Sequence, residues 1–122
     1  MPIRILLADD HPEFRQSLRQ LLGRHPDLEV IAEAASGWEA IDLANTHQPD
    51  VALLDVRMEG LTGIQAIPHI RHCSPQTAVV MLSMHRDHRY STSSMEAGAQ
   101  AYLLKDTTES ALVSVIRRLC AA

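Results

Sequence analysis

Side chains that could carry chemistry stand directly after the short apolar runs of this sequence. Asp9 and Asp10 follow the first run and Asp55 follows the third. Ser83 follows the fourth run and Lys105 the fifth. In an open parallel sheet, ligands bind in the crevice beyond the carboxyl ends of the strands. If the runs are strands of one such sheet, three carboxylates, a hydroxyl and an ammonium converge on a single crevice.

Three carboxylates held close together repel one another, and a divalent cation is the simplest means of keeping them ionised at neutral pH. Oxygen ligands with room left for water and phosphate oxygens suit Mg²⁺. Asp55 could then attack phosphorus as a nucleophile, because carboxylates form aspartyl-phosphate intermediates. Lys105 would neutralise charge on the transferred group while Ser83 donates a hydrogen bond to it.

Five apolar runs separated by longer amphipathic segments must position these residues. The first and third runs are nearly continuous in apolar residues, as in strands buried on both faces, whereas Glu29 and Glu33 make the second run more peripheral. Strict alternation of strands and helices predicts an α/β fold, a doubly wound five-stranded parallel sheet covered by helices on both faces. The predicted strands cover residues 3–8, 28–34, 51–54, 77–82 and 101–104.

Local signals mark the boundaries of the intervening helices. Pro12 stands at a favoured first-turn position. Ser36 and Glu39 form a capping-box pattern at the start of the second helix. The last helix is expected over about residues 108–120, with its apolar residues on one side.

Two segments weaken the helical pattern. Pro68 removes the hydrogen bond to the carbonyl of Ile64 and should kink or shorten the third helix, although Thr62 and Gln65 could cap its start. Between residues 86 and 98, a run of serine and threonine has poor helix propensity. We expect the helix in this segment to be the least stable element.

Composition bounds the class of protein. The 122 residues suit one domain, and 46% hydrophobic with only 3% aromatic residues implies an aliphatic core. A net charge of −4 without a basic run argues against direct nucleic-acid binding. Neither a membrane span nor a signal peptide is visible, so we expect a cytoplasmic protein in which Cys73 and Cys120 stay reduced packing residues.

The motifs together resemble the receiver domain of two-component response regulators. The matching stretches are 7–12 (LADDHP), 49–55 (PDVALLD), Gly63, 81–83 (MLS) and 96–106 (EAGAQAYLLKD). The resemblance covers nearly the whole chain and implies a flavodoxin-like sheet of strand order 2-1-3-4-5 with five helices. The DDHP start and the LLKD end resemble the NarL/FixJ subfamily, so residues 1–122 would form the receiver and a helix-turn-helix output domain would lie outside them.

The resemblance implies roles for the residues of the predicted crevice. Asp55 would accept a phosphoryl group from a histidine kinase. Asp10 and Asp55 would ligate Mg²⁺, Asp9 would reach it through water, and the main-chain carbonyl of Arg57 would complete the protein ligands. The chain would not be an enzyme, since it would catalyse only its own phosphorylation and dephosphorylation.

A switch is implied by the same resemblance. Ser83 would move towards the phosphoryl group and Tyr102 would rotate inward behind it, changing the surface of the fourth helix and fifth strand. Partner binding or homodimerisation, the latter through helices one and five or through helices four and five, would change as a result, with no direct contact of this domain to DNA or membrane. Transcription would then change through the output domain.

Four neighbours of the crevice differ from many receivers. Glu59 and Asp106 stand where the family often has proline, so Lys105 would be held less rigidly. Arg57 and His85 lie two residues after Asp55 and Ser83 and flank the route of attacking water in the family. Our hypothesis is that Arg57 and His85 tune the lifetime of the phosphorylated state.

Several alternative interpretations stay open at this point. An Asp-nucleophile phosphohydrolase would place Asp-x-Asp after the first strand, and a flavin-binding module would want a phosphate-cradling loop there. A constitutive docking module would lack a pocket residue, and none is missing. Singly, Asp10 could be only a helix cap and Tyr102 a core aromatic, while His69, His72 and Cys73 have a loose zinc-like spacing without a fourth ligand.

Overall fold

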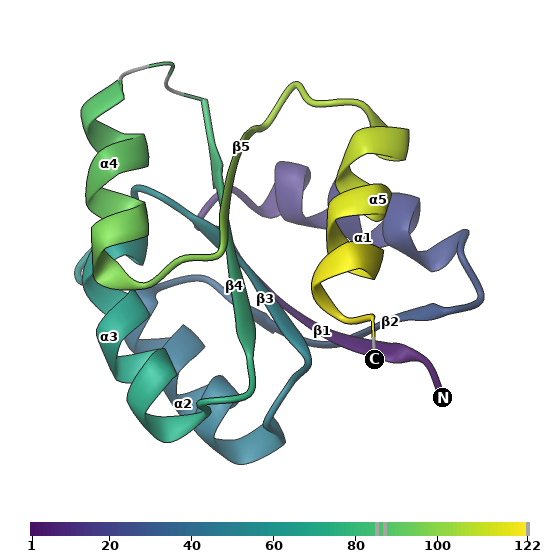
Figure 1. The fold of residues 1–122 in the computed structure, drawn as a ribbon, viewed down its shortest axis with the longest axis horizontal. Coiled ribbons are helices and arrows are strands. Elements are labelled where there is room, and N and C mark those ends of the chain that lie inside the picture. The colour runs from purple at the N-terminus through teal and green to yellow at the C-terminus, as the bar shows by residue number, and fades with distance from the viewer. Residues whose placement is uncertain (85, 87, 122) are drawn as a thin grey trace.

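A computed structural model describes residues 1–84, 86 and 88–121. Five parallel strands form one sheet in the order β2-β1-β3-β4-β5, which confirms the predicted doubly wound topology (Figure 1). The acidic second strand is outermost, as its two glutamates predicted. The strands are β1 (Ile3–Ala8), β2 (Leu28–Ala34), β3 (Val51–Asp55), β4 (Ala78–Ser83) and β5 (Ala101–Leu104).

Five helices cover the two faces of the sheet, with α1 and α5 on one face and α2, α3 and α4 on the other (Figure 1). Each face has its own aliphatic core, one around Leu53 and Ile116 and the other around Leu54 and Ile67. Successive residues of a strand point to opposite faces, so the central strands are apolar throughout. The helices are α1 (Pro12–Gly23), α2 (Gly37–His47), α3 (Gly63–Cys73), α4 (His88–Ala97) and α5 (Glu109–Leu119).

Two strands extend one residue further than predicted. Asp55 pairs with Leu82 and closes β3, and Ser83 pairs with Leu104 and closes β4. The start of β4 is also one residue later than predicted. Ladder hydrogen bonds join backbone groups, so they continue into polar residues that hydrophobicity alone excludes from a strand.

Among the described residues, the predicted start signals at Pro12 and Ser36 both stand at the start of a helix. Ser36 Oγ accepts a hydrogen bond from Glu39 N, although the Glu39 carboxylate accepts from Ala35 N and not from the cap residue itself. The cap of α1 is His11, which makes no side-chain capping bond. The interpretation of Asp10 as a helix cap is therefore wrong, because the chain is still extended at His11 and helical structure begins at Pro12.

The expected effect of Pro68 is wrong in one respect, because α3 continues through it to Cys73. A reciprocal capping box between Thr62 and Gln65 stabilises the first turn. Pro68 itself lies on the exposed side of the helix. The packed side of α3 is formed by other residues, among them Ala66, Ile67 and Ile70.

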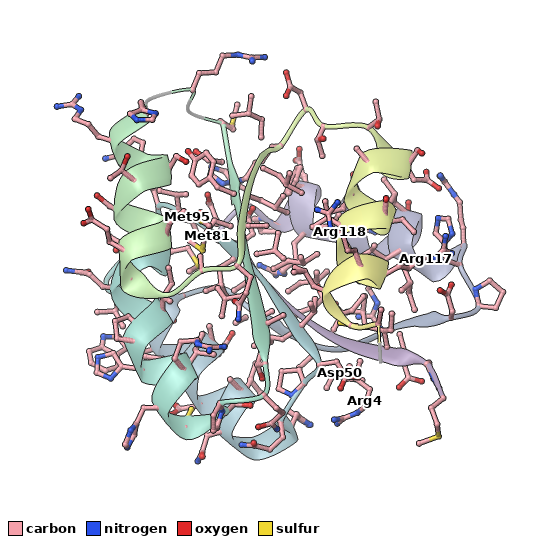
Figure 2. The ribbon with its side chains drawn as sticks, in the orientation of Figure 1. Arg4, Asp50, Met81, Met95, Arg117 and Arg118 are labelled. Atoms are coloured by element: carbon pink, nitrogen blue, oxygen red, sulfur yellow. The ribbon has the colours of Figure 1, made fainter. Side chains whose placement is uncertain are left out.

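The helix α4 forms over ten residues, and Ser94 is its one buried residue. Its predicted low stability stays a prediction. At the amino end of the inner strands β1 and β3, Arg4 N donates to Asp50 Oδ2 over 2.9 Å, and Figure 2 labels both residues there, near the two chain ends. Within the described residues, no helix is both long and apolar enough to cross a membrane.

Candidate functional site

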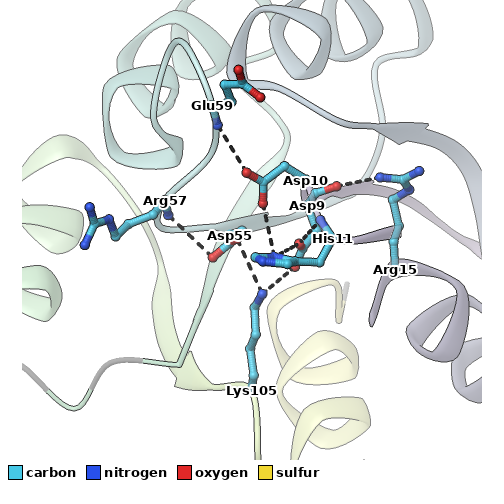
Figure 3. A network of polar contacts seen from close by, with 8 residues as sticks. All are labelled: Asp9, Asp10, His11, Arg15, Asp55, Arg57, Glu59 and Lys105. Atoms are coloured by element: carbon cyan, nitrogen blue, oxygen red, sulfur yellow. Dashed lines mark hydrogen bonds and ion pairs between the residues drawn. The ribbon is translucent and has the colours of Figure 1, made fainter. Parts of the chain in front are cut away.

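The ends of β1, β3 and β5 bring one ammonium between two carboxylates (Figure 3). Lys105 Nζ lies 2.6 Å from Asp9 Oδ2 and 3.4 Å from Asp55 Oδ2. All three side chains are at least nine-tenths buried, with exposed fractions of 8% for Lys105, 6% for Asp9 and 8% for Asp55. Charges so far out of water are retained only when they are paired. The predicted convergence of these residues is therefore present, with Lys105 as the shared counter-ion.

The environment of Asp55 disfavours its charged form. Loss of hydration is the largest cause of its raised pKa, followed by the negative charge of Asp9. Lys105 and the N–H of Arg57 oppose these effects without cancelling them. Any further positive charge placed beside Asp55 would therefore stabilise the charged form of its carboxylate.

Asp10 and His11 complete the acidic cluster, which we define as Asp9, Asp10, His11 and Asp55. One ligand atom from each of the four lies within 4.8 Å of the others. His11 Nδ1 is an ion-pair partner 3.1 Å from Asp10 Oδ1, and within the described part of the chain this buried oxygen has no hydrogen-bond partner. An orphaned buried carboxylate oxygen beside two others fits a divalent cation, because oxygen ligands of this kind suit Mg²⁺.

Lys105 is the only lysine of the chain, and several contacts fix its position. Its backbone N–H donates to the carbonyl of Ser83 over 2.8 Å, which ties the end of β5 to the end of β4. Its Nζ also lies 4.4 Å from the centroid of the Phe14 ring in α1. The ring forms an apolar wall and a cation–π partner for the ammonium, a contact that the sequence analysis missed.

Arg15 was also missed, since nothing in the sequence marks it as a neighbour of the crevice. Its guanidinium donates to the carbonyl of Asp9 and pairs with Glu33 over 3.1 Å. Figure 3 shows Arg15 beside the turn that carries Asp9 and Asp10. Arg15 thus fixes the turn that carries the first carboxylate.

The two predicted switch residues stand at the sheet end and edge. Ser83 is fully buried at the end of β4, in line with Leu104 of the neighbouring strand. Tyr102 is half-buried on β5 and packs against the core beneath α3 and α4. Their proposed movements stay predictions.

The divergent neighbours line the rim of the crevice. Arg57 N donates to Asp55 Oδ1 over 3.4 Å, while its guanidinium points away and lies 3.5 Å from the Tyr90 hydroxyl (Figure 3). Glu59 N donates to Asp10 Oδ2 over 3.3 Å. Asp106 pairs with Arg86 at the surface. The other residue of the lifetime hypothesis, His85, lies outside the described residues.

Gly63 allows α3 to start directly against the site. A Cβ at this position would lie 1.9 Å from the carbonyl oxygen of Asp55. Such a contact is impossible without movement of backbone, so the close approach of α3 to the end of β3 requires glycine. This packing explains why Gly63 accompanies the acidic residues.

The loose zinc-like group on α3 finds no support in the described residues. Among these residues, only the acidic cluster brings three or more side chains that could hold a metal close together. The ring of His69 instead lies 6.2 Å from the ring of Trp38, which is 59% exposed. These side chains form a surface contact between α2 and α3.

Comparisons with known proteins agree with this geometry. A family model described as the response regulator receiver domain matches residues 5–117. The chain is 38% identical over 116 residues to the nitrate/nitrite response regulator protein NarP of Escherichia coli (strain K12), covering 95% of this chain and 54% of that protein. It is 34% identical over 120 residues to NarL of the same strain, covering 98% and 56% respectively.

A solved structure has the same fold. A two-component response regulator of the LuxR family from Aurantimonas sp. SI85-9A1 superimposes with a TM-score of 0.93 at 35% identity, covering 99% of this chain and 86% of that chain. The present chain spans about half the length of the two curated relatives it was compared with.

Proposed function

This chain belongs to the family of response regulator receiver domains, and on that basis we propose that it is a signalling switch operated by phosphorylation of Asp55. The observation that carries the proposal is the buried Asp55 carboxylate, held 3.4 Å from Lys105 inside the acidic cluster. The phosphoryl donor is a phosphohistidine of a histidine kinase. The chain catalyses this transfer to itself and acts on no other substrate.

In the proposed transfer, an oxygen of Asp55 attacks phosphorus while the bond from phosphorus to the donor nitrogen breaks. The product is an acyl phosphate, and the donor imidazole leaves with the bonding electron pair. Asp10, Asp55 and the carbonyl of Arg57 would hold Mg²⁺, with Asp9 behind a water, and the ion would supply charge neutralisation for the phosphoryl oxygens. Lys105 stabilises the same developing charge from the other side.

The raised pKa of Asp55 supports this role in a specific way. Without a cation, Lys105 and the Arg57 N–H do not fully offset the loss of hydration and the charge of Asp9, so the ionised form of Asp55 is disfavoured. A bound cation would favour the ionised carboxylate, which is the form that acts as the nucleophile. The Lys105 ammonium already opposes the charges of Asp9 and Asp55, and a cation would release it to contact the incoming group. The acidic cluster therefore favours the binding of a cation before the phosphoryl group is transferred.

Downstream of transfer, Ser83 and Tyr102 are the proposed switch. Ser83 is buried at the sheet end, and Tyr102 lies on the edge strand β5 beside α4, whose one buried residue is Ser94. An element with so little buried surface can rearrange at low cost. Phosphorylation would change partner binding or dimerisation, the latter through α1 with α5 or α4 with α5, and would control transcription through a helix-turn-helix domain beyond these residues.

Phosphorylation is tested by intact-mass spectrometry after incubation with a small phosphodonor and Mg²⁺. We expect the mass gain of one phosphoryl group, which chelation of Mg²⁺ and the Asp55→Asn substitution both abolish. Asp42→Asn, at an exposed position of α2, is the matched control and should retain the gain. A gain that persists in Asp55→Asn, or no Mg²⁺-dependent gain at all, contradicts the proposal.

A further inference from the structure

The buried side chain of α4 carries a hydroxyl that is unpaired. Ser94 is 0% exposed, and its Oγ has no hydrogen-bond partner within the described part of the chain. A serine inside a helix can donate to the carbonyl four residues earlier, but the Ser94 hydroxyl makes no such bond to Tyr90. A hydroxyl that loses its bonds to water on burial and gains none inside the protein destabilises the packing that buries it.

Two other buried hydroxyls show the usual arrangement. Ser74 Oγ and Thr77 Oγ1 lie 2.6 Å apart, and Thr77 Oγ1 donates to the carbonyl of Pro49 over 2.7 Å. Both residues are 0% exposed, as Ser94 is, and they stand just before β4, at the end of the sheet away from the acidic cluster. The unpaired hydroxyl is therefore a feature of α4 and not of buried hydroxyls throughout this protein.

The rest of α4 adds little buried surface to its contacts with α3 and β5 (Figure 1). Tyr90 and Ala97 pack against the core but are only partly buried, and Met95 is 47% exposed. The position of α4 therefore depends strongly on the packing around Ser94. That packing is the one that the unpaired hydroxyl weakens.

We infer that the Ser94 hydroxyl destabilises the packed position of α4 in the unphosphorylated chain and thereby favours the rearrangement of α4 on phosphorylation. In a second position of α4 that exposes Ser94, the hydroxyl regains its bonds to water. The free-energy difference between the two positions is therefore smaller than it would be for an apolar residue, and the minor position is more populated before phosphorylation. The signalling half of this inference rests on the proposed phosphorylation of Asp55, whereas the destabilisation of α4 does not.

Hydrogen–deuterium exchange of the unphosphorylated 122-residue protein, measured on peptides that cover α4, tests the destabilisation. Ser94→Ala should slow the exchange of α4 about tenfold more than Ser93→Ala does. Ser93 is exposed in the same helix, so both substitutions raise helix propensity but only one removes a buried hydroxyl. Ser94→Cys, which fills the same space with a weakly polar thiol, should also slow the exchange, and this excludes an effect of lost volume. Exchange in Ser94→Ala that is equal to or faster than in Ser93→Ala overturns the inference.

The same exchange measurement after phosphorylation tests the signalling half. Incubation with a small phosphodonor and Mg²⁺ should change the exchange of α4 in the parent and in Ser93→Ala, and the change should be smaller in Ser94→Ala. All three chains should gain the same phosphoryl mass, because neither serine takes part in the transfer. An equal change of exchange in all three chains contradicts the signalling half while the mass gain stands. Absence of the mass gain from every chain contradicts the proposed function and the signalling half with it, and the exchange of the unphosphorylated variants then decides the destabilisation by itself.

Discussion

Replacing Lys105 with Met removes the only ammonium of the site and keeps a long unbranched side chain. Lys105 Nζ lies 2.6 Å from Asp9 Oδ2 and 3.4 Å from Asp55 Oδ2. At an effective dielectric constant of about 20, these separations correspond to attractions of about 6 and about 5 kcal/mol, largely offset by the cost of dehydrating the three charges. Removing one partner leaves buried charge uncompensated, so K105M should lose about 3 to 5 kcal/mol of unfolding free energy at pH 7.

The pH dependence of this loss follows from Asp55. Its pKa in the folded chain is already raised by lost hydration and by Asp9, and Lys105 opposes the rise. Without Lys105 the pKa rises further above the ordinary value of 3.8. A raised folded pKa means that the folded state binds the proton more tightly, so stability falls as pH rises above 3.8 through the folded pKa. The deficit of K105M should therefore be largest at neutral pH and small at pH 3.

Urea unfolding followed by far-ultraviolet circular dichroism measures this deficit, without divalent cation, at pH 7 and pH 3. Lys105→Arg keeps the positive charge and should lose less stability than K105M. Added Mg²⁺ should restore part of the loss in K105M, since it supplies the missing charge. Equal urea midpoints for K105M and the parent at pH 7, or a deficit that does not shrink at pH 3, would refute the electrostatic account of the site.

Three further outcomes are expected. Asp55→Asn should raise the unfolding free energy at pH 7 by about 1 kcal/mol without cation, a gain that vanishes at pH 3 because the raised pKa no longer matters there. Gly63→Ala should lose more than about 3 kcal/mol in urea unfolding because its Cβ meets the Asp55 carbonyl, whereas Gly23→Ala, with open space around it, should lose none. Phe14→Leu should couple to K105M by about 1 kcal/mol in a double-mutant cycle, and additive losses would exclude the cation–π contact.

The placement of the acidic residues could be predicted because it depends on topology alone. Parallel strands end at one edge, so Asp9, Asp55 and Lys105 meet whatever the details of packing. The capping signals at Ser36 and Thr62 were equally local, and both are used. Local and topological signals agree over most of this chain, which is the condition for reading a fold from sequence.

Other features depend on geometry that no local pattern specifies. The contact of Phe14 with Lys105 requires the rotation of α1 against the sheet, and the approach of His11 to Asp9 requires an extended residue at the cap. These contacts depend on side-chain direction, and sequence spacing alone leaves them open. Pro68 removes one backbone hydrogen bond whichever side it faces, yet α3 continues past it to Cys73, with a capping box at its start and buried residues along its packed side.

A single lysine gives this protein an unusual labelling chemistry. Amine-reactive reagents can modify only two groups of these 122 residues, the terminal amine at exposed Met1 and Lys105 Nζ, whose side chain is 8% exposed. The buried amine, clamped by carboxylates, should acylate far more slowly than the terminal one. Its modification rate therefore reports the opening of the crevice directly. Immobilisation through the fast amine would hold every molecule by the end of the sheet opposite the acidic cluster.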